Sequence, residues 1–138
     1  MRQATHTLEV PTDGQGLFDI TSEVCRFVAG EHLSTGLLTA FISHTSASLV
    51  ISENADPDVQ RDMVSGFRDL APRDRPWRHD SEGADDMPAH IRCALTGVQL
   101  SIPVVDGRPV LGTWQGIYVF EHRDRPHRRR VTLHLLGE

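Results

Sequence analysis

The segment Val110–Phe120, VLGTWQGIYVF, is an apolar run that predicts a β-strand, yet its first half is unusual for one. Two glycines, a threonine, a tryptophan and a glutamine occupy positions 112–116. Glycine weakens a strand interior and often marks the close approach of a ligand or of another backbone. The indole and the carboxamide need hydrogen-bond partners if they are buried. The segment is therefore either a β-bulge with a core tryptophan or a strand that faces a ligand.

Apolar periodicity and capping residues predict the other elements of the chain. Strands are expected over residues 2–10, 36–43, 48–52, 98–105, 110–121 and 130–136. Helices are expected over residues 21–30, from Asp56-Pro57 onward and over residues 86–96, with the Pro-rich segment 71–84 as a loop. Strands dominate and their connections look antiparallel, which is typical of the α+β class. The length of 138 residues predicts one domain.

Each predicted helix has an apolar side that we expect to face the core. In the first helix this side contains Val24, Phe27 and Val28. In the second it contains Val59, Met63, Phe67 and Leu70, and in the third Ile91 and Leu95. Several C-terminal strands lack a polar face, so helices or other subunits are expected to cover them.

Composition excludes several classes of protein. The net charge is −5, and every one of the 14 basic residues is arginine. Without lysine there is no Schiff-base or P-loop lysine, and the acidic balance argues against a nucleic-acid partner. No apolar stretch approaches about 20 residues and no signal-peptide pattern is visible, so we expect no membrane partner and a cytoplasmic location. Cys25 and Cys93 are expected to be small buried thiols.

Histidines and carboxylates scattered along the chain suggest a site for a divalent metal ion, with Zn²⁺ or Mg²⁺ as candidates. Taken singly, each has a simpler explanation as a surface or capping residue, and Glu53 in particular is well placed to cap the following helix. The metal-site hypothesis requires the three imidazole rings to converge within about 5 Å, so that one ion reaches each of them. The residues in question are His44, His79 and His90 with Glu53, Asp85 and Asp86.

Two further chemistries deserve a test. A hydrolase would use Ser46 or Ser48, but the chain has no G-x-S-x-G elbow, and this possibility requires a histidine nitrogen within about 3.2 Å of the hydroxyl. The run Arg128–Arg130 precedes the last strand, where strand alternation separates Arg129 from its two neighbours. One of these arginines is a candidate anion ligand.

Together these motifs resemble the YjbQ-like family, which is often labelled secondary thiamine-phosphate synthase. The resemblance spans essentially the whole chain. It is carried by HTSAS at 44–48, Glu53-Asn54, His79, DDMPAHI at 85–91, SIPV at 101–104, GRPVLGTWQ at 107–115 and RRV at 129–131. Many members have an Asn-rich segment where this chain has Met87-Pro88, so the roles of Asp85 and Asp86 stay open between the two.

The resemblance implies a mostly antiparallel sheet closing toward a barrel, with three helices packed on it, and a homotrimer whose motif residues gather in one pocket near a subunit boundary. It also implies a set of site residues, to which we assign roles as follows. The expected catalytic residues are His44, Glu53, Asp85, Trp114 and Gln115, the expected substrate-binding residues are Ser46 and Arg130, and the expected metal ligands are His44, His79 and His90.

The activity implied by the family is the joining of hydroxymethylpyrimidine pyrophosphate and thiazole phosphate with loss of pyrophosphate, so the expected partner is a small phosphorylated substrate. The alternative is a protein that binds a metal ion or an anionic metabolite without turnover, because no accessible nucleophile is recognisable and a family label alone does not establish activity.

Overall fold

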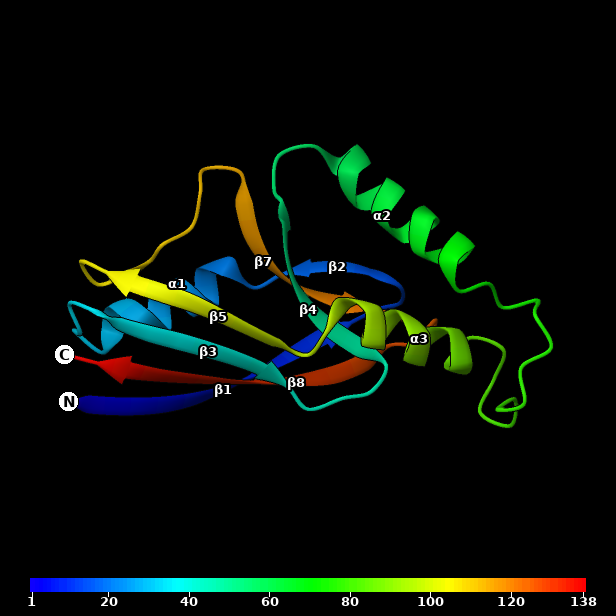
Figure 1. Ribbon diagram of the computed structural model, residues 1–138, viewed down its shortest axis with the longest axis horizontal. Helices are drawn as coiled ribbons and strands as arrows, with labels where there is room; N and C mark the ends of the chain where they lie inside the picture. The colour runs from blue at the N-terminus through cyan, green and yellow to red at the C-terminus, as the bar shows by residue number, and fades with distance from the viewer.

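The computed structural model describes all 138 residues, which form eight strands and three helices (Figure 1). The helices are α1 (Thr21–Gly30), α2 (Pro57–Leu70) and α3 (Asp86–Thr96). The strands are β1 (Arg2–Thr12), β2 (Gly16–Asp19), β3 (Gly36–Ile42), β4 (Ala47–Glu53), β5 (Gln99–Val105), β6 (Arg108–Pro109), β7 (Gln115–Glu121) and β8 (His127–Gly137). None of the helices combines the length and apolar character that a transmembrane span requires.

The strands form two sheets in which every pairing is antiparallel. The larger sheet has the order β1-β8-β3-β5-β6 and the smaller one β2-β7-β4. In Figure 1 the smaller sheet crosses the larger one, α1 lies on the far side of β3 and β5, and α2 and α3 lie at the opposite end of the molecule from the chain termini. The predicted α+β class with an antiparallel, half-barrel sheet and three helices is confirmed.

The core lies between the inner faces of the two sheets and α1. Alternate residues of β3 and β8 point into it, including Leu38, Ala40, Leu133 and Leu135, which are fully buried. Burying such side chains is the main favourable contribution to folding. The predicted apolar side of α1 is confirmed, since Val24 and Val28 are fully buried in the same cluster.

The prediction of one strand over residues 110–121 is wrong in its first half. Regular pairing in β7 starts at Gln115, and residues 110–114 form a loop in which Trp114 is 65% exposed. The glycine-rich sequence does not bulge inside a strand; it leads into one. Two short strands, β2 and β6, were not expected, because each is too short to give a clear periodic pattern.

Two of the predicted helix faces also need correction. In α2 the predicted residues Val59, Met63 and Phe67 are half-buried, and the Phe67 ring packs edge-on against Phe120. Leu70, however, is 67% exposed, and no residue of the helix is fully buried. In α3, Leu95 is 60% exposed, and the helix instead buries Arg92 and Cys93. The Cys93 thiol donates to the Ala47 carbonyl, which turns this side of α3 toward β4.

A buried ion pair joins the two sheets. Glu121 at the end of β7 is fully buried and accepts hydrogen bonds from Arg129 of β8, with 2.7 Å between Oε1 and Nε and a second contact between Oε2 and Nη2. The Thr12 hydroxyl of β1 donates to the same carboxylate at 2.6 Å. Because both charged groups are removed from water, loss of either one would leave the other buried without a counter-charge.

The protonation of Glu121 follows from these contacts. Burial alone would raise the pKa of this carboxyl, but the hydrogen bonds from Arg129 and Thr12 outweigh it and hold the pKa below its ordinary value of 4.5. A carboxyl with a lowered pKa stabilises the folded state above its unfolded pKa. That contribution is lost as the pH falls below about 4.5 and through the folded pKa.

We expect Glu121→Gln to lower the free energy of unfolding by about 3–5 kcal/mol at pH 7, because it leaves Arg129 buried without a counter-charge. The measurement is urea unfolding at pH 7 and at pH 3.5. The difference between variant and wild type should shrink at the lower pH. Glu9→Gln, a half-exposed carboxylate on β1, is the matched control and should change stability by less than about 1 kcal/mol. Equal losses in the two variants would contradict the prediction.

Candidate functional site

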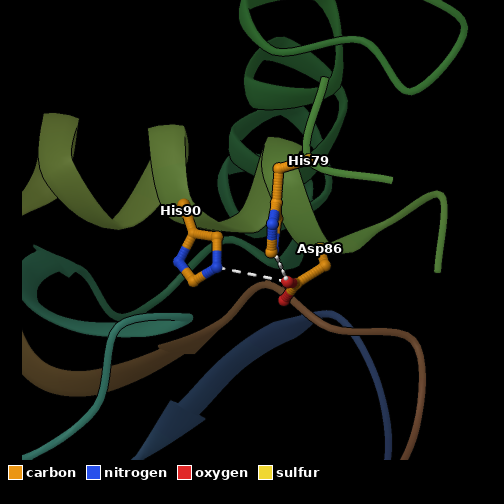
Figure 2. A group of neighbouring side chains, drawn as sticks. All are labelled: His79, Asp86 and His90. Carbon is orange, nitrogen blue, oxygen red and sulfur yellow. Dashed lines mark hydrogen bonds and ion pairs between the residues drawn. The ribbon is translucent and has the colours of Figure 1, made fainter. Parts of the chain in front are cut away.

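Three side chains that could hold a metal ion meet at the start of α3 (Figure 2). They are His79 from the loop between α2 and α3, and Asp86 and His90 from α3 itself. Their candidate ligand atoms all lie within 4.8 Å of one another. We call these three residues the His/Asp group.

Helix α3 supplies two residues of the His/Asp group, and the loop before it supplies the third. Asp86 and His90 are four residues apart, so one turn of α3 places them on the same face. His79 is brought to that face by the preceding loop, which is held by two contacts to its backbone. Trp77 donates its indole N–H to the Pro72 carbonyl, and Arg123 donates to the Glu82 carbonyl, each at 2.9 Å.

Asp86 is the centre of the group. Its Oδ2 lies 2.7 Å from His79 Nε2 and 3.2 Å from His90 Nε2, while Oδ1 accepts from Arg123 Nη1 at 2.7 Å. Burial would raise the pKa of Asp86, but the hydrogen bond from His79 and the positive charge near it outweigh burial and lower the pKa. The carboxylate is therefore ionised, as a metal ligand must be.

The second ring nitrogen of His90 fixes the orientation of its imidazole. Nδ1 lies 3.0 Å from the Thr45 carbonyl, which only accepts hydrogen bonds, so Nδ1 carries a proton. In the neutral ring the Nε2 lone pair then faces the Asp86 carboxylate, and a proton or a cation must lie between these two acceptors. An imidazole oriented by a backbone carbonyl is the usual arrangement around a metal ligand. The donor set of two imidazoles and one carboxylate suits Zn²⁺ and related ions.

Asp85 and Asp86 have separate positions. Arg123 donates from Nε to Asp85 Oδ2 at 2.8 Å while its Nη1 reaches Asp86, so one guanidinium spans both carboxylates. Asp85 also accepts the backbone N–H of Asp124 at 2.9 Å. Asp86 thus lies with the imidazoles, whereas Asp85 binds Arg123. Arg123 in turn orients Asp86 through its second hydrogen bond.

His44 lies apart from the His/Asp group, so only two of the three predicted imidazoles meet. Its Nε2 accepts the backbone N–H of Arg130 at 2.9 Å, and its Nδ1 lies 3.3 Å from Arg129 Nη1. Burial and the charge of Arg129 lower the pKa of His44. Ser46 is buried beside it and accepts from Arg129 Nη2 at 3.0 Å. His44 and Ser46 therefore border the buried ion pair.

The remaining predicted residues lie at the far end of β4 and β7. Glu53 accepts the N–H groups of Ala55 and Asp56, each at 3.0 Å, so it organises the turn into α2. Gln115 is the register partner of Glu53, while Ala47 and Glu121 pair at the other end of the same two strands. Seven paired residues span about 20 Å. Within one chain, Glu53, Trp114 and Gln115 are therefore remote from the end of β7 at which Arg123 joins the His/Asp group.

Arg130 is exposed on β8, and its nearest carboxylate oxygen, on Glu9, is 3.8 Å away. Its neighbour Arg129 is buried instead, as strand alternation requires. Arg129 is one of the three arginines predicted as candidate anion ligands, and the anion that it binds is the Glu121 carboxylate. Glu121, at the end of β7, and Arg123 are not among the predicted site residues.

A serine–histidine contact meets the distance that a hydrolase would require: Ser48 Oγ lies 2.9 Å from His122 Nε2. However, Ser48 is fully buried, so a substrate carbonyl cannot reach it. Burial and the charge of Arg92 lower the pKa of His122 to about 3, which makes this imidazole a very weak base. The contact satisfies two buried polar groups in the core, and the geometry does not support a hydrolase.

Comparison with known proteins matches residues 6–138 to the family described as UPF0047 protein YjbQ-like. The chain belongs to this family. A UPF0047 protein of Synechocystis is 51% identical over 138 residues, which is 99% of this chain and 94% of the relative. The UPF0047 protein YjbQ of Salmonella typhimurium is 43% identical over 133 residues, 96% of each chain. These names state no function.

Solved structures of YjbQ-like relatives share the fold. A YbjQ-like protein of unknown function from Sulfolobus solfataricus superposes with a TM-score of 0.88 at 25% identity, covering 99% of this chain and 100% of the other. A conserved hypothetical protein from Thermus thermophilus gives 0.84 at 39% identity, covering 95% and 99%. The resemblance stated from the motifs is therefore confirmed at the level of family and fold.

We expect the His/Asp group of this YjbQ-like protein to bind one equivalent of Zn²⁺. Calorimetric titration of the metal-free protein checks this. Asp86→Asn and His90→Ala should each weaken binding by about 100-fold, because each removes a donor atom. His6→Gln is the matched control, since this exposed imidazole stacks on Phe27 of α1 and lies outside the His/Asp group. Unchanged affinity in both site variants would show that the ion binds elsewhere.

Proposed function

We propose that this protein forms thiamine phosphate by joining hydroxymethylpyrimidine pyrophosphate to thiazole phosphate. In this reaction the thiazole nitrogen forms a bond to the pyrimidine methylene carbon. The bond from that carbon to the pyrophosphate oxygen breaks, and the leaving pyrophosphate takes the electron pair. The single observation that carries the proposal is the His/Asp group, in which three side chains that could bind a metal ion lie together beside Arg123. The chain also matches the YjbQ-like family over residues 6–138.

Residues of the group and of other parts of the chain fit the demands of this reaction. A divalent cation held by His79, Asp86 and His90 would neutralise charge on the leaving pyrophosphate. Arg123 keeps Asp86 ionised and correctly oriented through its hydrogen bond at 2.7 Å. Arg130 is exposed and its ion pair with Glu9 is long, at 3.8 Å, so its guanidinium is available to a phosphate group. The exposed indole of Trp114 offers a face on which a heteroaromatic ring with developing positive charge would stack.

A homotrimer is part of the same proposal, because one chain does not bring Trp114 and Gln115 to the His/Asp group. Apolar side chains gather on the outer face of the larger sheet, where Leu37 is 45% exposed, Phe41 43% and Leu136 39%. Leu37 and Leu136 are register partners, so they form adjacent parts of one apolar surface. A neighbouring subunit that covers this surface would also supply the loop 110–114 in trans.

The decisive assay supplies both precursors with Mg²⁺ or Zn²⁺ and measures thiamine phosphate after oxidation to its fluorescent thiochrome form. We expect product from the wild type, and a fall in kcat of at least about 100-fold in Asp86→Asn and His90→Ala. His6→Gln should keep full activity, because this exposed imidazole lies outside the His/Asp group. Chelation should abolish turnover and added metal should restore it.

A protein that binds its ligand without turnover is the second candidate, favoured by the burial of Ser48, which keeps the serine that contacts a histidine out of reach of a substrate. Calorimetry on the same protein separates the two functions. Binding of metal and of either precursor with no product above the uncatalysed background would replace the enzymatic proposal with this one.

For the assembly, we expect light scattering to give a mass close to three times the 15.4 kDa of one chain. Leu37→Glu should dissociate the trimer, because it buries an unpaired charge at the interface. Leu70→Glu on α2, where the side chain is 67% exposed, is the matched control and should leave the mass unchanged. A monomeric wild type at micromolar concentration would rule the trimer out.

A further inference from the structure

A polar cavity of about 510 Å³ lies beside the His/Asp group, where the end of α2 approaches α3 and the turns before β2 and after β7. Its lining contains no aliphatic or aromatic side chain apart from Pro72. The polar lining comes from three arginines, two aspartates and one glutamine: Arg68, Arg73, Arg92, Asp74, Asp124 and Gln15. We call this cavity the arginine pocket.

The most unusual member of the arginine pocket is Arg92. Only 4% of this residue is exposed, and no carboxylate lies within 4.0 Å of its guanidinium. Nη2 donates to the Ala71 carbonyl at 2.9 Å, Nη1 reaches Gln15 Oε1 at 3.3 Å, and Nε has no partner. A buried cation without a counter-ion and with an unused donor is costly unless an anion completes the site.

A second arginine converges on the same amide oxygen. Arg68 Nε also lies 3.3 Å from Gln15 Oε1, so two guanidinium groups share one neutral acceptor at long distance. Arg68 forms no ion pair, whereas Arg73 donates to Asp124 at 2.7 Å. Burial, together with the charges of Arg68 and Arg73, lowers the pKa of Arg92. Arg68 and Arg92 are therefore held close together although neither is paired with a carboxylate.

We propose that the arginine pocket binds a compact phosphate-bearing anion of the diphosphate class. Guanidinium groups match phosphate oxygens with paired hydrogen bonds, and a phosphate in the pocket would supply the counter-charge that Arg68 and Arg92 lack. The nearly complete absence of apolar lining excludes a large hydrophobic ligand.

The inference does not rest on the proposed function, because it needs only the three arginines. The arginine pocket and the His/Asp group are neighbours, but they have no residue in common. The backbone N–H of Asp124 donates to Asp85, on the side of the His/Asp group, while its carboxylate faces Arg73 and Gln15. An anion in the pocket is thus separated from the imidazoles by this chain segment.

The test is calorimetric titration of the full-length, metal-free protein with inorganic pyrophosphate in 0.15 M salt and chelator. Arg68→Gln and Arg73→Gln change exposed side chains and should leave folding intact, as a thermal melt verifies. Each should weaken binding about tenfold, the loss expected for one charge-assisted hydrogen-bond partner. Arg26→Gln, an exposed arginine of α1 outside the pocket, makes the same charge change and should bind like the wild type.

Further arms identify the ligand class and the site. Inorganic phosphate should bind more weakly than pyrophosphate, and malonate more weakly still; malonate binding as tight as pyrophosphate would overturn the phosphate assignment. His90→Ala should retain full pyrophosphate affinity. Loss of affinity in His90→Ala would assign the anion to the His/Asp group and overturn the inference. Lack of binding by the wild type, or an equal loss in Arg26→Gln, would overturn it as well.

Discussion

The buried contact between Glu121 and Arg129 is the constraint on which the rest of the structure depends. It links the small sheet to the large one at the point where β7 ends, with Thr12 of β1 bound to the same carboxylate. Apolar packing tolerates small displacements, but a charge removed from water requires its partner at hydrogen-bond distance. The relative placement of the two sheets is therefore set by one carboxylate and not only by the shape of the core.

The same carboxylate also positions the candidate site. Glu121 Oε2 accepts the backbone N–H groups of His122 at 3.0 Å and Arg123 at 3.2 Å, which fixes the chain direction just after β7. From there the Arg123 side chain reaches Asp85 and Asp86, and Asp86 in turn meets both imidazoles of the His/Asp group. A chain of direct hydrogen bonds therefore connects the interior of the fold to the candidate metal ligands. Because each link is a short polar contact, this path gives the site its rigidity.

The features that were predicted correctly are those determined by residues close together in the sequence. Helices α1 and α3 have the predicted bounds, and Gly97 ends α3 as predicted, although neither helix has a side-chain hydrogen bond at its N-cap. What the sequence missed depends on distant pairing: β2 exists because four residues pair with β7, and residues 110–114 lie outside the strand although they are apolar. For the site, the sequence predicted His79 and His90 as metal ligands but left the choice between Asp85 and Asp86 open. The separation of His44 from His79, and the burial of Arg92, follow from tertiary packing that no spacing encodes.

One consequence follows from the origin of His79. Two of the three donors of the His/Asp group are fixed on a helix, whereas the third comes from a long connection and its side chain is 45% exposed. The position of the third donor therefore depends on the conformation of this connection. If the group binds an ion, as proposed, the free energy of binding includes the cost of holding that backbone in one conformation. Evolution could tune ion affinity through the prolines and glycines of this connection while every donor atom stays the same.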